Sequence, residues 1–498
     1  MTTSFDFHTL SLTIDQTLAE YNRARVPGPL GLHLYEVVQG DRSKILRFRH
    51  EHAHFTSFLA TGLADLYGVF SDYTLALLYA YVHRQMTGDG AAALTLPLIM
   101  PGEEGSPAHG SELRRAWDQV NNLQAFLFGF GTSATVPALV DTGPQDDFWA
   151  AHFDLCFSRI VQRFYRLLES LATDAGTAYP GGRALPLITV PQGQRVLSAR
   201  AVMEAYAITI EVLNTHFRGI RTEYTTYSEP VVRNPGPLYT AAVECLLGAG
   251  GRNSSLDEFL AGRAPPDVYY LVVAASFAAM QVPVVQQLDG EVEFGGRPGA
   301  LSPAHRLHRL AGRLSQGELG PVPAKIRGDR EALLTWLRSC HRAWGDEDPI
   351  VALSAAHERH QSDPALRDVP AHEKSMIQMA WSTRANFFGD PNDFVLDAGM
   401  FSERYPCQVR YVRTRDGKLV ALGEAKNIQA RYLADHTPVM LQAAVFARHW
   451  SSTWEKLPEV PAADRADSLA GSIAWAGCLF GDAARGREWK VPAITLRM

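Results

Sequence analysis

Residues 50–61 read HEHAHFTSFLAT, and both the fold and the site that the sequence predicts start from this stretch. Within and beyond it, mainly apolar residues recur at i, i+3, i+4, i+7, i+8 and i+11, which is the spacing of one helix face. The spacing predicts an amphipathic helix over 50–86. Ser57 and Thr61 are small residues on the face that carries the first and last histidines, so a second helix has room to come close there.

The stretch contains the pattern H-E-x-x-H, formed by His50, Glu51 and His54. Two histidines four residues apart point the same way on a helix, so their rings can hold one metal ion. Glu51 is turned roughly a quarter-turn away from them, where it can accept a proton from a water on that ion. Immediately upstream, residues 31–48 predict a β-hairpin that turns near Gly40.

A catalytic zinc ion usually has three protein ligands and one open position, so a third ligand is needed. Ser198 is a suitable N-cap for a predicted helix over 199–217, in which Glu204 and Glu211 are seven residues apart and share a face. Glu204 is our candidate for the third ligand. Glu211 is the candidate for a partner that supports a ligand from behind.

These two helices resemble the gluzincin branch of zinc metallopeptidases, in which H-E-x-x-H is followed by a helix of the form E-G-x-A-x-x-x-E. The resemblance covers two short segments, and this chain has Ala205 where many such families have glycine. It implies zinc ligands at His50, His54 and Glu204 and a general base at Glu51. The implied activity is hydrolysis of a peptide or other amide bond, with a protein or peptide as substrate.

Other interpretations of the same residues stay open at this level. The histidines would be unremarkable at a solvated helix start. On a β-strand, His50, His52 and His54 would all lie on one face, as in cupin-like sites. Glu204 and Glu211 would equally suit the exposed face of an amphipathic helix.

A second constellation belongs to a different class of protein. Asp397, followed by Glu424 and Lys426 on a predicted strand, resembles the pattern of PD-(D/E)xK nucleases. There the acidic residues and the lysine could hold Mg²⁺ against a phosphate. The net charge of −6 disfavours nucleic acid as a partner, because such proteins usually carry a basic surplus or a basic stripe. A third class is a non-catalytic scaffold whose metal site is structural.

The composition predicts a folded protein of the cytoplasm. Hydrophobic residues make up 46% and charged residues 20% of the 498 residues. The five cysteines show no C-x-x-C spacing, which favours reduced thiols. The N-terminus lacks the pattern of a signal peptide, and the longest apolar run, 268–280, is too short to span a membrane and predicts a buried helix.

The expected architecture is an α+β fold that is mainly α-helical. We expect a zincin-like domain over 1–285, a loose linker over 286–330 and a C-terminal α+β domain over 331–498. Four residues near the second motif are candidates for stabilising the transition state, and nothing selects among them: Tyr206, His216, Tyr224 and Tyr227. Besides those above, helices are predicted over 112–128, 147–174, 330–345, 350–361 and 370–386, and strands within 394–401, 407–414 and 418–426.

Overall fold

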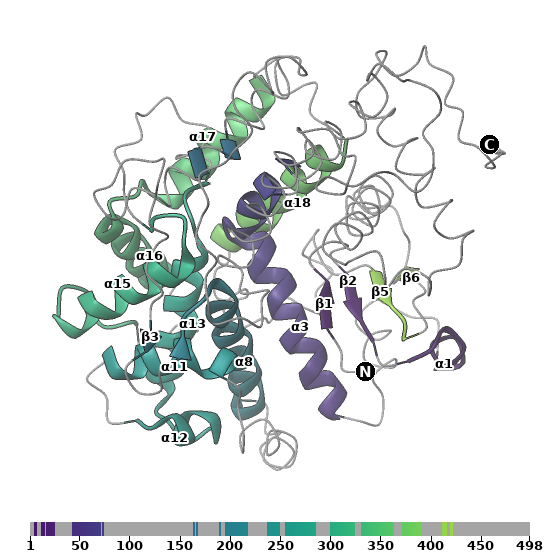
Figure 1. Cartoon of the computed structure of the whole chain (residues 1–498), viewed down its shortest axis with the longest axis horizontal. Helices are drawn as coiled ribbons and strands as arrows, with labels where there is room; N and C mark the ends of the chain where they lie inside the picture. Colours follow the sequence, from purple (N-terminus) through teal and green to yellow (C-terminus); the bar gives the residue numbers. More distant parts are fainter. Residues whose placement is uncertain are drawn as a thin grey trace, which may run out of the picture.

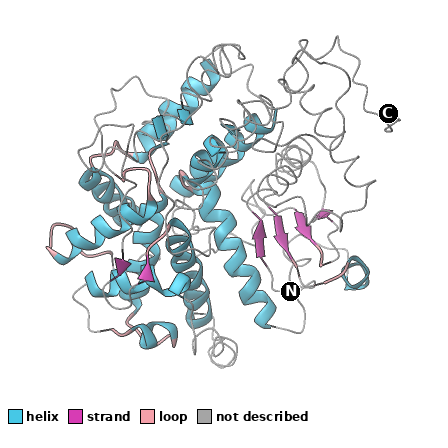
Figure 2. Ribbon diagram, in the orientation of Figure 1, coloured by secondary structure: helices cyan, strands magenta, loops and turns pink. Residues whose placement is uncertain are grey.

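The computed structural model describes part of the chain, and that part is mostly helical with a few short strands (Figure 2). This confirms the mainly α-helical fold. The described residues are 4–6, 11–14, 16–24, 42–70, 72–73, 163–164, 166–167, 189–190, 195–217, 237–249, 254–284, 299–323, 330–362, 371–389, 411–415 and 419–421.

Helix α8, Ala199–Phe217, lies at the centre of the described helices (Figure 1). It packs against α3 (Arg42–Ala60), α11 (Pro237–Ala249) and α13 (Pro266–Met280). The sequence predicted α8 over the same residues. Its N-terminus is capped as expected, because the Ala201 N–H donates to Ser198 Oγ at 3.1 Å.

Helix α3 begins at Arg42, so the second strand of the predicted hairpin is wrong. Residues 43–49 read SKILRFR, in which an alternating apolar pattern coexists with good helix formers, and a short run of this kind does not separate strand from helix. The first predicted strand lies outside the described residues. Because α3 starts early, His50 lies more than two turns inside a continuous helix rather than at a frayed end.

The helix predicted over 50–86 is interrupted after Ala60. Residues 61–62 form a bend and a turn, and the chain is helical again over 63–70. Gly62 lies so close to the segment that follows α13 that a Cβ atom there would overlap the carbonyl oxygen of Val282. Ser57 and Thr61 are fully buried, as expected for residues that allow close packing of a second helix.

Helix α13 confirms the buried helix predicted from the longest apolar run, because every side chain from Val268 to Met280 is buried. It also packs against α15 (Pro303–Ser315) and α16 (Arg330–Trp344). In the part of the chain described here, no helix combines the length and the apolar character needed to cross a membrane.

A four-stranded sheet joins the two ends of the described chain, in the order β1-β2-β5-β6. β1 pairs antiparallel with β2, β2 pairs parallel with β5, and β5 pairs antiparallel with β6. Helix α3 lies next to β1, on the side of β1 that is opposite to β2 (Figure 1). The strands are β1 (Ser4–Asp6), β2 (Ser11–Thr13), β5 (Tyr411–Arg413) and β6 (Leu419–Ala421), and a separate pair is formed by β3 (Thr189–Val190) and β4 (Arg195–Val196).

The predicted helices of the second half are present as α16, α17 (Pro349–Ser362) and α18 (Ala371–Gly389). Between them and the first half, α15 forms an ordered helix inside the expected linker and packs on α11 and α13. α18 also contacts α3, and β5 pairs with β2. The proposed division into domains stays a prediction, although contacts between described elements cross its boundary. Two short helices, α1 (Leu18–Ala24) and α12 (Leu256–Leu260), complete the described elements.

Candidate metal centre

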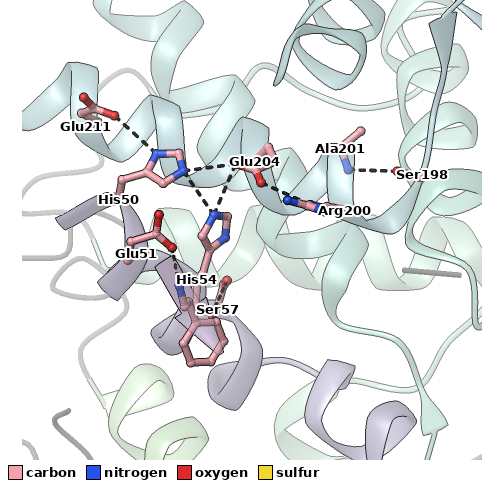
Figure 3. Close-up of polar contacts among 10 residues, drawn as sticks. His50, Glu51, His54, Ser57, Ser198, Arg200, Ala201, Glu204 and Glu211 are labelled. Carbon is pink, nitrogen blue, oxygen red and sulfur yellow. Dashed lines mark hydrogen bonds and ion pairs between the residues drawn. The ribbon is translucent and has the colours of Figure 1, made fainter. Parts of the chain in front are cut away.

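Helices α3 and α8 cross so that the two sequence motifs meet, although they are about 150 residues apart (Figure 3). His50 Nε2 lies 3.1 Å from Glu204 Oε2, and His54 Nε2 lies 3.3 Å from the same oxygen. The two histidine Nε2 atoms are 3.2 Å apart. His54 and Glu204 are buried and His50 is nearly so. One ligand atom from each residue therefore points to a common centre.

The three separations fit the edges of a coordination tetrahedron. Zinc binds histidine nitrogen at about 2.0–2.1 Å and carboxylate oxygen at about 2.0–2.2 Å. Two ligands at such lengths, separated by the tetrahedral angle of about 109°, lie about 3.3–3.4 Å apart. The observed 3.1, 3.2 and 3.3 Å are close to that value. The cluster of His50, His54 and Glu204 could thus hold a metal ion with little rearrangement.

The charges around the cluster attract a cation. Burial alone would lower the pKa of His50, but contacts with Glu204 and Glu211 outweigh it and raise that pKa well above the usual value. Burial likewise opposes ionisation of Glu204, yet the nearby His54 and His50 lower its pKa far below the ordinary range. Glu211 Oε2 lies 3.3 Å from His50 Nδ1, on the side of the ring away from Glu204. Without a metal ion, a proton on His50 supplies the positive charge.

Glu51 lies beside the cluster and not within it. Its Oε2 accepts a hydrogen bond of 2.7 Å from the Phe5 N–H of strand β1. Burial raises the pKa of Glu51, and the neighbouring His54 and His50 oppose that rise only in part. The side chain is therefore a stronger proton acceptor than an exposed glutamate. It is offset from the two histidines along α3, as the helical spacing predicted.

Two residues that the sequence did not single out also belong to this site. Arg200 Nε lies 3.5 Å from Glu204 Oε1, so the other oxygen of that carboxylate is left to face the histidines. The ring of Tyr239, near the start of α11, lies 6.5 Å from the His50 ring. Burial raises the pKa of the Tyr239 phenol, and the charge of Glu204 adds to the rise, so this hydroxyl stays protonated at neutral pH.

The interpretation of the histidines as residues of one β-strand is wrong. His52 is buried, but its Nδ1 lies 3.3 Å from Thr56 Oγ1 and its ring packs beside Phe55, away from the other two histidines. Glu204 and Glu211 are also buried, so the interpretation as an exposed helix face is wrong as well. The sequence left these two alternatives open for different reasons: a short run does not separate strand from helix, and spacing alone does not show which helix faces meet.

Of the four candidates for stabilising the transition state, Tyr206 is buried in the core and packs near Phe277. The side chains of the other three lie outside the described residues, as do Asp397, Glu424 and Lys426. No spacing pattern in the sequence indicates Tyr239, which is 28 residues beyond Glu211. Only the packing of α11 on α8 brings it to the site.

Comparison of the chain with models of known protein families, with curated proteins and with solved structures gave no match. The chemistry of the site therefore rests on its own geometry.

Proposed function

We propose that this protein is a zinc-dependent hydrolase, a metallopeptidase that cleaves a peptide or other amide bond. The proposal rests on one observation, which is that His50, His54 and Glu204 form a triangle with the edge lengths of a zinc site. Two nitrogens and one carboxylate oxygen leave a fourth position open, as catalytic zinc sites do. The resemblance of the two motifs to gluzincins agrees with this donor set.

In the proposed reaction, each residue of the site has one task. Bound at this triangle, zinc would act as a Lewis acid towards the substrate carbonyl and make a water more acidic. Glu51 accepts the proton of the attacking water and passes it to the leaving amine. Glu211 holds the His50 ring in place through Nδ1, and Arg200 holds Glu204 through Oε1. We assign Tyr239, whose ring lies 6.5 Å from that of His50, the task of donating a hydrogen bond to the oxygen that gains negative charge.

The experiment compares Glu51→Gln with His54→Ala in the purified full chain. Metal content is measured by mass spectrometry, and cleavage is measured on a degenerate peptide library. Glu51→Gln should keep zinc at wild-type stoichiometry and lose activity by roughly 10²–10⁴-fold, the usual effect of losing a general base. His54→Ala should lose both metal and activity. A Glu51→Gln protein that is metal-free or fully active would refute the proposal.

A non-catalytic metal-binding scaffold is the second candidate, because the same triangle could hold a structural ion. The Glu51 carboxyl beside the triangle, whose pKa is raised by burial, favours the hydrolase. Binding of zinc by the wild type without cleavage of any library peptide would select it.

A further inference from the structure

Strand β1 approaches the metal helix with its backbone and its side chain together. β1 is at the edge of the described sheet, and its outer edge faces α3 (Figure 1). Phe5 is the middle residue of β1 and is paired in register with Leu12 of β2. In an antiparallel strand the N–H and C=O of one residue point to the same side. Since the Phe5 N–H donates to Glu51, it points away from β2 and towards the site.

The aromatic ring of Phe5 fixes where this amide lies on the helix. The ring makes edge contacts with Phe55 and Phe58, with centroid distances of 6.0 and 6.2 Å. Glu51, Phe55 and Phe58 are at i, i+4 and i+7, so they share one face of α3. Both aromatic partners are fully buried. Strand β1 therefore contacts this helix face in two ways, through the packing of the Phe5 ring and through the hydrogen bond to Glu51.

The hydrogen bond from the Phe5 N–H makes the two carboxylate oxygens of Glu51 different from each other. Oε2 accepts the Phe5 N–H at 2.7 Å, a length typical of a bond to an ionised acceptor (Figure 3, dashed line from Glu51). Oε1 is then available to accept the proton of the attacking water. A glutamate has three rotatable side-chain bonds, and an unrestrained carboxylate would have to find this orientation in every turnover.

We propose that the Phe5 backbone amide is a positioning group for Glu51, which rests on the proposed hydrolase function. It holds Oε2 so that Oε1 faces the water at the metal. The general base of the H-E-x-x-H helix is thus oriented by a strand 46 residues earlier in the chain. Because the Phe5 amide acts through Glu51, its effect is expected on kcat and not on metal affinity.

The sharpest test compares Phe5→Pro with Phe5→Leu. Both lose the ring, but only proline lacks the N–H. This amide lies outside the β1–β2 ladder, so proline removes no hydrogen bond from the sheet, and proline is tolerated at such edge positions. Whatever the lost ring costs is common to both variants. At equal folding stability and equal zinc content, the kcat difference between them reports the effect of the amide on Glu51.

Both variants should bind one zinc with equal affinity and show similar KM for a peptide cleaved by the wild type. Phe5→Pro should have a kcat about 10²-fold below that of Phe5→Leu, the order expected when a reacting group is misplaced by about 1 Å. Equal kcat values would overturn the proposal. So would a kcat difference that disappears once the two proteins carry the same amount of zinc.

A second measurement does not depend on activity. Deuterium exchange at the Phe5 amide is followed by fragmentation mass spectrometry of the N-terminal peptide. The amide should exchange faster in Glu51→Ala than in the wild type, while Glu51→Gln keeps an accepting oxygen and should keep the protection. Unchanged exchange in Glu51→Ala would overturn the proposal even if the hydrolase function holds. Faster exchange in a protein that cleaves no peptide would refute the hydrolase function and, with it, the positioning role.

Discussion

The affinity of the site for zinc should depend on pH across the neutral range, because zinc must displace a proton from His50. In the metal-free protein the pKa of His50 is raised well above its usual value, since the contacts with Glu204 and Glu211 outweigh burial. A histidine that binds a metal must be neutral. The lowered pKa of Glu204 means that this carboxylate is already ionised and releases no proton near neutral pH.

The sign and size of the effect follow from these two shifts. Below the raised pKa of His50, each bound zinc releases one proton from that ring, so Kd rises about tenfold for every unit by which the pH falls, or about 1.4 kcal/mol. Above the raised pKa the dependence levels off. An unperturbed histidine would level off near pH 6.5. The structure predicts that the tenfold dependence continues beyond that point.

The assay is titration of the metal-free protein with zinc over a series of pH values. Calorimetry in two buffers with different ionisation enthalpies gives the number of protons released. Glu211→Gln is the matched variant, because it removes the negative charge beside His50 Nδ1 while keeping an accepting oxygen, and it leaves the three proposed ligands in place. It should keep one zinc per chain and shift the plateau to lower pH. A Kd that does not change between pH 6 and 7, or a Glu211→Gln curve identical to that of the wild type, would refute the reasoning.

Two further predictions concern the site and its support. Tyr239→Phe should lower kcat by about 10²-fold at unchanged zinc content, because it removes a protonated donor beside His50; full activity in this variant would exclude the proposed role of the hydroxyl. Arg306→Met should cost about 3–5 kcal/mol of unfolding free energy, measured by chemical denaturation, because it strips the buried Asp346 carboxylate of an ion pair of 2.7 Å. A loss below about 1 kcal/mol would show that His341, whose Nδ1 lies 3.5 Å from Asp346 Oδ2, is a sufficient partner or that Asp346 is neutral.

The sequence predicted best where local and tertiary signals agree. Helix α8 has a serine N-cap, a strong helical period and no glycine or proline, and its predicted bounds match the structure. The start of α3 was missed, because residues 43–49 satisfy both the strand and the helix pattern over a short run. The interruption at Gly62 was missed too, since the close approach of Val282 that requires a glycine comes from a segment 220 residues later.

The candidate site divides along the same line. The spacing within one helix indicated His50, Glu51 and His54, because two ligands at i and i+4 lie on the same helix face. Glu204 was predicted as a ligand because it is an acidic residue on a predicted helix and because the two histidines of the motif need a third ligand. The contributions of Phe5 and Tyr239 could not be predicted. Each is one residue with no pattern of its own, and only the packing of strand or helix on the two central helices brings it into place.

Contacts at the C-terminal end of α3 hold this helix, and with it the two histidines, in position. The last carbonyl groups of a helix have no partner within it. Here Gln281 Nε2, from the end of α13, donates to the Ala60 carbonyl at 2.8 Å, and Arg384 of α18 donates to that of Thr61. Arg384 also pairs with Asp65 at 2.7 Å.

Helix α3 is therefore held by β1 at Glu51, between the two histidines, and by side chains of Gln281 and Arg384 at Ala60 and Thr61. Since α8 packs along the same helix, Glu204 has little freedom to leave the two rings. An ion that entered would find its ligand atoms already near coordination distance and would have to order few side chains. A preformed site of this kind favours tight binding, because the metal does not have to assemble its own ligands. The geometry of the site is then set by the fold.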